Sequence, residues 1–290
     1  MPELPEVETT VRKLKPLLNG KRILQFNKKI LEVERRGKAI LIWLEPALTK
    51  TRVLQDLASA TARARGIFQQ KNIRVFAKPD VETEHYLLAF HQRMSGRLLV
   101  VDRDFKDKYI RKRFKLSDGK DLAFHDVRRF GVVWYGPSKK VLSDQYFRTL
   151  GQDALTISFK NFKKILFSVR GIKSFLLNQK NIAGVGNIMA DEILWYAKIH
   201  PERKMKNLGD AEIKSLYSSL KFVLNRSIKL GGSTMRDWFR PDNSKGGYFE
   251  KRFVYDREGE SCFNCKDKII RKKIAGRSSY FCLKCQPRRV

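Results

Sequence analysis

The four cysteines constrain the fold of this 290-residue chain more than any other feature. Cys262, Cys265, Cys282 and Cys285 lie within the last 29 residues, as two C-x2-C pairs separated by sixteen residues. This is the spacing of a tetrahedral four-cysteine zinc site, and the interval is long enough for a β-hairpin to return the second pair. Two disulfides are the alternative, but a cytosolic chain with no other cysteine has little use for them. We therefore expect one structural Zn2+ ion, because four thiolates leave no open position for a substrate.

The charge of the chain points to a polyanionic partner. Lys and Arg number 61 against 30 Asp and Glu, a net charge of +31, while 42% of the residues are hydrophobic and 11% aromatic. The charge therefore belongs to a chain that can fold, and such a chain most often binds nucleic acid. Composition alone leaves open a protein that is basic for another reason, such as one beside the ribosome. No apolar run approaches a membrane span and no signal-peptide pattern opens the chain, so we expect a cytoplasmic protein with no membrane partner.

The first half of the chain has the pattern of one leading helix followed by strands. Apolar residues at helical spacing predict a helix over residues 5–18, and residues 53–65 also favour a helix. Strand-like patterns occupy residues 23–26, 38–44, 73–76, 86–90, 97–101, 113–116, 122–124 and 132–135, with a turn at Ser117-Asp118-Gly119.

The second half is helical in pattern up to the cysteine-rich end. Helices are predicted over residues 158–179, 187–199 and 209–229, the last ending before Gly231-Gly232. Residues 240–250 are rich in Pro, Gly, Asn and Ser and predict a loop. These changes predict domains over residues 1–150, 151–250 and 251–290.

The N-terminal segment carries groups capable of covalent chemistry. Removal of Met1 would leave Pro2 as a secondary amine, and an α-amino group titrates at roughly 7.7–8.0, so part of it is unprotonated near neutral pH. Such an amine can attack an aldehyde-level carbon to give an iminium ion, an electron sink, with Glu3 supplying acid–base work. The residue types alone fit a helix start better, because Pro and Glu are common there.

A series of motifs in a fixed order favours the catalytic interpretation of Pro2 and Glu3 over the helix start. The segment MPELPEVETTVRKL resembles the N-terminus of formamidopyrimidine-DNA glycosylase, a bacterial family that removes oxidised purines from DNA. The resemblance covers nearly the whole chain in the family's order: RMSG (93–96), DVRRFG (126–131), AGVGNIMADEILW (183–195), HP (200–201), GGYF (246–249) and the four-cysteine hairpin. It implies an α+β fold, with an N-terminal β-sandwich domain that has a leading helix. A C-terminal helical domain with a helix–two-turn–helix and a four-cysteine zinc-finger β-hairpin would follow.

The resemblance also implies catalytic roles. Pro2 matches the nucleophile that attacks C1′ of the damaged nucleotide, expels the base and leaves a Schiff base. Glu3 matches the acid–base partner and Glu6 a supporting carboxylate. Lys38, in ERRGKAIL, matches the lysine that assists base release, where a cation would stabilise developing negative charge.

Three side chains match those that the family inserts into the duplex: Met94, Arg128 and Phe130. A glycosylase takes its target base out of the stack, so an apolar wedge replaces the lost stacking and a guanidinium bonds the orphaned partner base. Without the resemblance, Met94 and Phe130 would be interpreted as core residues.

Further residues match phosphate contacts of the family. Asn187, at the hinge of the helix–two-turn–helix, matches a residue that binds backbone phosphate, and we expect it to be the N-cap of the following helix. Arg277 matches the hairpin arginine that clamps the phosphate beside the lesion. Arg111 stands where the family often has a histidine that contacts DNA. Residues 45–90 depart from the family pattern and look inserted or rearranged.

The leading hypothesis is a monomeric, bifunctional DNA glycosylase and abasic-site lyase of base excision repair, associated with the bacterial nucleoid. Its partner would be double-stranded DNA that contains oxidised bases or abasic sites. It would remove 8-oxoguanine and formamidopyrimidines and then cleave the strand by β,δ-elimination. The alternatives are an endonuclease VIII-like enzyme that prefers oxidised pyrimidines, and a non-catalytic zinc-bearing protein that binds damaged DNA.

Overall fold

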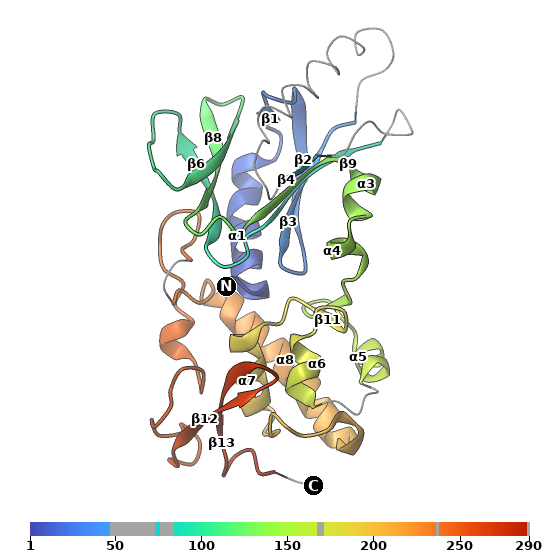
Figure 1. Ribbon diagram of the computed structural model, residues 1–290, viewed down its shortest axis with the longest axis vertical. Helices are drawn as coiled ribbons and strands as arrows, with labels where there is room; N and C mark the ends of the chain where they lie inside the picture. The colour runs from blue at the N-terminus through green and yellow to red at the C-terminus, as the bar shows by residue number, and fades with distance from the viewer. Residues whose placement is uncertain (47–72, 76–83, 167–170, 236–237, 289–290) are drawn as a thin grey trace. The chain divides into compact units, whose positions relative to one another are not determined.

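The computed structural model describes residues 1–46, 73–75, 84–166, 171–235 and 238–288 (Figure 1). The chain forms two compact units. Unit 1 contains residues 1–2, 6–148 and 234–246, and unit 2 contains residues 3–5, 149–233 and 247–290. The helix predicted over residues 53–65 lies outside the described residues.

Unit 1 is built from two sheets. The six-stranded sheet has the order β1 (Arg22–Ile23), β2 (Lys28–Arg36), β3 (Ala39–Leu44), β5 (Tyr86–His91), β9 (Val132–Pro137) and β4 (Ile73–Val75). The second sheet has the order β6 (Gly96–Asp102), β8 (Lys120–Asp126) and β7 (Ile110–Lys115). All neighbours are antiparallel except β4 and β9. Two short helices, α3 (Ser138–Leu142) and α4 (Gln145–Arg148), follow β9.

One apolar core joins the two sheets of unit 1 and the leading helix α1 (Leu4–Leu18). The helix contributes its predicted stripe, Val7, Val11, Leu14 and Leu18, which is buried against residues of both sheets. The six-stranded sheet adds residues such as Ile42 and Phe90, and the second sheet adds Phe114 and Phe124. The predicted β-sandwich with a leading helix is confirmed.

The main error in the first half concerns β2, which the sequence patterns did not predict. A β-bulge shifts the pairing of β2 with β3 between Ile30 and Glu32. The fully buried apolar residues of β2, Ile30 and Val33, are therefore three residues apart, which hides the two-residue period of a strand. The strand predicted over residues 23–26 is mostly a turn, in which the Phe26 N–H donates to the Ile23 carbonyl at 3.2 Å.

Unit 2 is helical, with a β-hairpin near its end. Its helices are α5 (Phe159–Ile165), α6 (Ile172–Leu177), α7 (Asn187–Tyr196) and α8 (Asp210–Lys229), with 3-10 turns η1 (Met205–Asn207) and η2 (Phe249–Lys251). A short parallel pair, β10 (Gln152–Asp153) and β11 (Ile182–Ala183), precedes α7, and the hairpin is formed by β12 (Ile269–Ile274) and β13 (Arg277–Cys282). The helices share one core, which includes Phe162, Phe175, Leu194 and Leu220.

Two of the three predicted helices in this unit need correction. The helix predicted over residues 158–179 is not continuous, because α5 stops at Ile165 and Gly171 is the extended N-cap of α6. The helix predicted over residues 187–199 ends at Tyr196, since Lys198 adopts a positive φ of 58°. Helix α8 matches its prediction, and Gly231 and Gly232 after it have positive φ, which favours glycine. Among the described residues, no helix combines the length and apolar character of a membrane span.

Candidate active site and nucleic-acid interface

In unit 1, strand pairing brings two predicted DNA-contacting loops together. Met94 lies in the loop between β5 and β6, and Arg128 and Phe130 lie in the loop between β8 and β9. Strands β6 and β8 are antiparallel, with Gly96 opposite Asp126. The two loops therefore emerge at the same end of the three-stranded sheet.

A single carboxylate ties these loops to each other. Asp126 Oδ1 accepts the Ser95 hydroxyl at 2.5 Å, and Asp126 Oδ2 accepts the Gly131 N–H at 2.7 Å. Ser95 Oγ in turn accepts the Arg128 N–H at 3.1 Å. Because Asp126 and Ser95 are both buried, these bonds are strong and fix the relative positions of the loops.

The side chains that these loops carry point outward. Met94 is 40% exposed and Phe130 is 54% exposed, although both are large and apolar, and Arg128 is also exposed. Close packing holds the backbone beneath them, since a Cβ atom on Gly131 would lie 2.3 Å from the Phe124 ring. Two exposed apolar groups and a guanidinium on a fixed frame can fill a gap in a base stack.

Arg111, on β7, donates hydrogen bonds to the start of the loop between β8 and β9. Its Nε donates to the Asp126 carbonyl at 2.8 Å and its Nη2 to the Val127 carbonyl at 3.4 Å. The guanidinium also lies 5.7 Å from the centre of the Tyr109 ring. Arg111 therefore braces the backbone from which Arg128 and Phe130 project.

Lys38 lies in the tight turn between β2 and β3, after Gly37 with its positive φ of 60°. The lysine is only 5% exposed, and its backbone N–H donates to the Tyr146 hydroxyl at 3.3 Å. His91, which packs edge-on against Tyr146, is also buried, and this burial lowers the pKa of His91 to about 3, with Arg93 and Lys38 adding to the shift.

The N-terminal residues divide between the units. Pro2, buried, belongs to unit 1. Glu6 lies in the first turn of α1, is 2% exposed, and its carbonyl accepts the Thr10 hydroxyl at 2.9 Å. Glu3 belongs to unit 2.

In unit 2, the Glu3 carboxylate is bound by the N-terminus of α7. Oε2 accepts the N–H groups of Gly186 and Met189 at 2.9 and 3.1 Å, and Oε1 accepts that of Ile188 at 2.9 Å. A helix N-terminus leaves N–H groups without partners inside the helix and carries a partial positive charge, so a buried carboxylate is well placed there. The residue after Pro2 is thus held in one position by three hydrogen bonds.

This arrangement explains the glycines of the AGVGN motif and corrects one prediction. A Cβ atom on Gly186 would lie 2.2 Å from the Glu3 carboxyl carbon, and one on Gly184 would lie 2.5 Å from Leu4. Only glycine permits this approach of the N-terminal segment. The N-cap of α7 is Gly186 and not Asn187 as predicted, because Glu3 supplies the capping oxygens from a distant part of the chain.

Asn187 instead contacts the hairpin that carries Arg277. Its Nδ2 donates to the Ser278 carbonyl at 3.0 Å. Arg277 is the exposed first residue of β13, directly after a two-residue turn in which Ala275 and Gly276 both have positive φ. The structure thus brings the backbone beside Arg277 to the start of α7.

Sequence reasoning missed a buried ion pair that joins the same elements. Lys173 on α6 is 0% exposed, and its Nζ donates to Asp191 Oδ1 on α7 and to Ser279 Oγ on β13, both at 2.6 Å. Asp191 Oδ2 also accepts the Tyr280 N–H at 3.0 Å. Burial raises the pKa of Asp191 to about 7 and lowers that of Lys173, while their mutual attraction opposes both shifts. Charged residues within two otherwise apolar segments, one in IKSFLL and two in IMADEILW, are the signal that could have revealed the pair.

The four cysteines form one cluster at the base of the hairpin. Their Sγ atoms all lie within 4.8 Å of one another, with Cys262 and Cys285 at 3.7 Å and Cys265 and Cys282 at 3.4 Å. Zinc–sulfur bonds of about 2.3 Å in a tetrahedron place the sulfur atoms about 3.8 Å apart. The donor set and its spacing therefore fit a structural zinc ion. The indole N–H of Trp195, at the end of α7, donates to Cys262 Sγ at 3.4 Å.

Comparison with known proteins agrees with this arrangement. Residues 1–133 match the model of the formamidopyrimidine-DNA glycosylase N-terminal domain, and residues 150–238 match that of the formamidopyrimidine-DNA glycosylase H2TH domain. The formamidopyrimidine-DNA glycosylase of Rickettsia massiliae is 34% identical over 99% of this chain and 98% of its own.

Solved structures give the same result. The MutM (Fpg) protein of Thermus thermophilus superimposes with a TM-score of 0.76 at 31% identity, covering 98% of both chains. A mutant of the Lactococcus lactis Fpg, in complex with Fapy-dG-containing DNA, superimposes with a TM-score of 0.77 at 28% identity, covering 99% of this chain and 100% of that one.

Fold, site and similarity together define a DNA glycosylase of base excision repair. The chain belongs to the formamidopyrimidine-DNA glycosylase family. The family resemblance inferred from the ordered motifs is confirmed.

Proposed function

We propose that this protein removes oxidised purines, such as 8-oxoguanine and formamidopyrimidines, from double-stranded DNA and then cleaves the abasic strand. The observation that carries the proposal is the fixed position of Glu3, beside Pro2, on the N-terminus of α7. The DNA complex of the Lactococcus lactis relative, which contains Fapy-dG, supports this substrate class.

In the proposed mechanism, the Pro2 nitrogen of the processed chain attacks C1′ of the damaged nucleotide. A C–N bond forms, the glycosidic bond breaks, and its electron pair leaves with the base, which Lys38 assists. The sugar opens to an iminium ion, which draws electrons and so permits loss of the 3′ and then the 5′ phosphate. Glu3 would move the protons of these steps, and Glu6 would support it.

Binding of DNA is shared between the two units in this proposal. Met94, Arg128 and Phe130 fill the space that the extruded nucleotide leaves, and Asn187 and Arg277 hold backbone phosphate. We also propose that the four cysteines hold one zinc ion, which would supply a rigid cross-link at the base of the hairpin and no reacting group. The protein would act as a monomer on the DNA of a bacterial nucleoid.

Borohydride reduction during turnover tests the mechanism. With a duplex that contains 8-oxoguanine, we expect a covalent adduct that peptide mapping assigns to Pro2. Pro2→Gly should turn over poorly yet bind the duplex, because its terminal amine is primary and its backbone is freer. An extended N-terminus should abolish the adduct, because the Pro2 nitrogen becomes an amide without a basic lone pair.

Pro5→Gly is the matched control, since it adds similar backbone freedom to α1 without touching the terminal amine. It should retain the adduct. An adduct on Lys38, or full activity of the extended chain, would contradict the proposal. A panel of lesions separates the alternatives: preference for oxidised pyrimidines indicates the endonuclease VIII-like enzyme, and binding without any adduct indicates the non-catalytic protein.

A further inference from the structure

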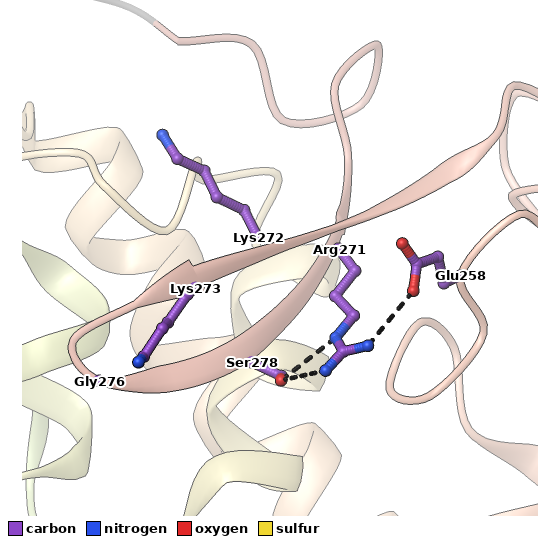
Figure 2. Close-up of a pocket in the computed structure, with 6 residues that line it drawn as sticks. All are labelled: Glu258, Arg271, Lys272, Lys273, Gly276 and Ser278. Carbon is purple, nitrogen blue, oxygen red and sulfur yellow. Dashed lines mark hydrogen bonds and ion pairs between the residues drawn. The ribbon is translucent and has the colours of Figure 1, made fainter.

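A basic pocket lies on the hairpin of unit 2. It has a volume of about 540 Å3 and is lined by Glu258, Arg271, Lys272, Lys273, Gly276 and Ser278 (Figure 2). Three of these residues are cationic and one is acidic, so the pocket suits an anion. The roles assigned above to Arg277 and Asn187 do not involve it.

Arg271, Lys273 and Ser278 of the pocket lie on the face of the hairpin opposite Arg277, and Lys272 borders the pocket from the Arg277 face. In the register of β12 and β13, Arg271 pairs with Tyr280 and Lys273 with Ser278, so these four side chains share one face. Ile274 pairs with Arg277, and Lys272 with Ser279, on the other face. Figure 2 shows Lys272 directed to one side of β12 and both Arg271 and Lys273 to the opposite side.

The Arg271 guanidinium is held in place at this pocket. Its Nε and Nη2 donate to the Ser278 hydroxyl at 3.2 and 3.1 Å (Figure 2). Its Nη1 lies 3.7 Å from Glu258, but both side chains are about half exposed, so this ion pair is weak. A guanidinium has five N–H donors in a planar fork that matches the oxygens of a phosphate.

The two lysines differ in what they already contact. Lys272 Nζ is 2.9 Å from both carboxylate oxygens of Glu202. The Lys273 side chain is exposed and has no hydrogen-bond or ion-pair partner among the residues that the structure describes. Arg271 and Lys273 therefore supply the positive charge available on the pocket face, against the single carboxylate of Glu258.

We propose that Arg271 and Lys273 bind a phosphate of the DNA backbone, in addition to the phosphate proposed for Arg277. This inference rests on the proposed function, because it extends the contact of the same hairpin with DNA. A hairpin that carries cations on both faces can engage two phosphates of a densely charged duplex at once. Ser278 positions the guanidinium, and Glu258 weakens the site.

The salt dependence of duplex binding tests the proposal. The full-length, zinc-loaded protein is titrated with a fluorescent, undamaged duplex over a series of KCl concentrations. The double variant R271A/K273A should bind more weakly, and the slope of log K against log salt should become less steep by about 0.9 for each phosphate that the variant no longer neutralises. Glu258→Gln should bind more tightly than the unaltered protein, and Ser278→Ala more weakly.

Lys163→Ala, on α5, is the control. It removes one positive charge from an exposed ion pair of the same unit, with Asp210, and lies outside the hairpin and its pocket, so its slope should stay unchanged. Equal slopes for R271A/K273A and the unaltered protein, or an equal change in Lys163→Ala, would overturn the proposal. Zinc content and thermal midpoint verify that each variant is folded.

Two further measurements distinguish the source of the anion and the cause of a failure. Perturbation of Arg271 and Lys273 by inorganic phosphate alone, with an unchanged DNA slope, would show a free-anion site and overturn the proposal. Because the duplex is undamaged, the salt slope does not depend on catalysis. Loss of the Pro2 adduct with a normal salt response would therefore contradict the proposed function alone.

Discussion

The two units hold their functional groups by different physical means. In unit 1, the exposed side chains lie on loops beside an apolar core that two sheets and α1 share, and one buried carboxylate, Asp126, joins the loops. In unit 2, buried charges hold the groups near the start of α7. Backbone N–H groups bind the Glu3 carboxylate, and the Lys173 ammonium binds Asp191 and Ser279. The hairpin itself has only a small apolar cluster around Trp195, Val254 and the cysteines.

This difference has a consequence for stability. An apolar core is non-directional and spreads its contribution over many residues, so one substitution in unit 1 removes a limited part of it. A buried charge is stable only while its partner is present. The start of α7 and the hairpin of unit 2 should therefore depend on a few specific residues, whereas the apolar cores of both units should be weakened more gradually.

Loss of the cysteine cluster should have the largest effect. Cys282→Ser should release zinc and unfold the hairpin, because structural zinc provides about 10 kcal/mol or more of folding free energy in small zinc domains. DNA binding should fall sharply, since Arg277 is on that hairpin, while hydrogen exchange of β3 and β5 in unit 1 stays slow. Full zinc content together with full DNA affinity would contradict this prediction.

Removal of one partner of the buried ion pair should come next. Asp191→Asn leaves Lys173 as an unpaired buried cation and should lower the free energy of unfolding by about 3–5 kcal/mol. Urea unfolding followed by fluorescence checks this. The double variant Lys173→Met with Asp191→Leu should be more stable than Asp191→Asn, and Asp210→Asn, in an exposed pair with Lys163, should have no effect. Equal losses of unfolding free energy in the single and double variants would contradict this role of the ion pair.

Loss of the Asp126 hydrogen bonds that join the two loops of unit 1 should lower stability less than the preceding changes do. It should affect function more than stability. Asp126→Asn cannot accept both the Ser95 hydroxyl and the Gly131 N–H, and loss of one such bond costs about 1.5–3 kcal/mol. Because the loops then move independently, a fluorescent base beside the lesion should report slower extrusion. Asp102→Asn, at the other end of β6, is the control and should extrude normally.

The smallest expected effect is a pH dependence in unit 1. The pKa of buried His91 is about 3, below its ordinary 6.5, so the folded state favours the neutral ring. As the pH falls below 6.5 the unfolded state takes up a proton that the folded state does not, so stability declines by up to about 1.4 kcal/mol per pH unit, and by less than about 1 kcal/mol between pH 7 and 6. His91→Gln should flatten the dependence of the thermal midpoint on pH between pH 7 and 6 relative to the unaltered protein. The control substitution His85→Gln, at an exposed residue, should leave this pH dependence unchanged.

Much of the fold was predictable because its signals are local. The stripe of α1, the strands β3, β5, β8 and β9, and helix α8 follow from periodicity and flanking glycines. The bulge in β2 and the extended Gly171 interrupt those periods, so these two elements were predicted wrongly. The outward positions of Met94 and Phe130 could not be derived from periodicity, because an apolar side chain alone suggests burial.

The sequence by itself determined the charge and its polyanionic partner, the four-cysteine cluster, the ordered family motifs and most secondary structure, since each depends on composition or short spacing. Only the tertiary structure decided which polar groups meet. Glu3 caps a helix whose N-cap residue, Gly186, lies 183 residues later, and Lys173 reaches Ser279 across 106 residues. Such contacts leave no periodic trace, because hydrogen bonds and ion pairs act over a few ångströms in space and are independent of distance along the chain.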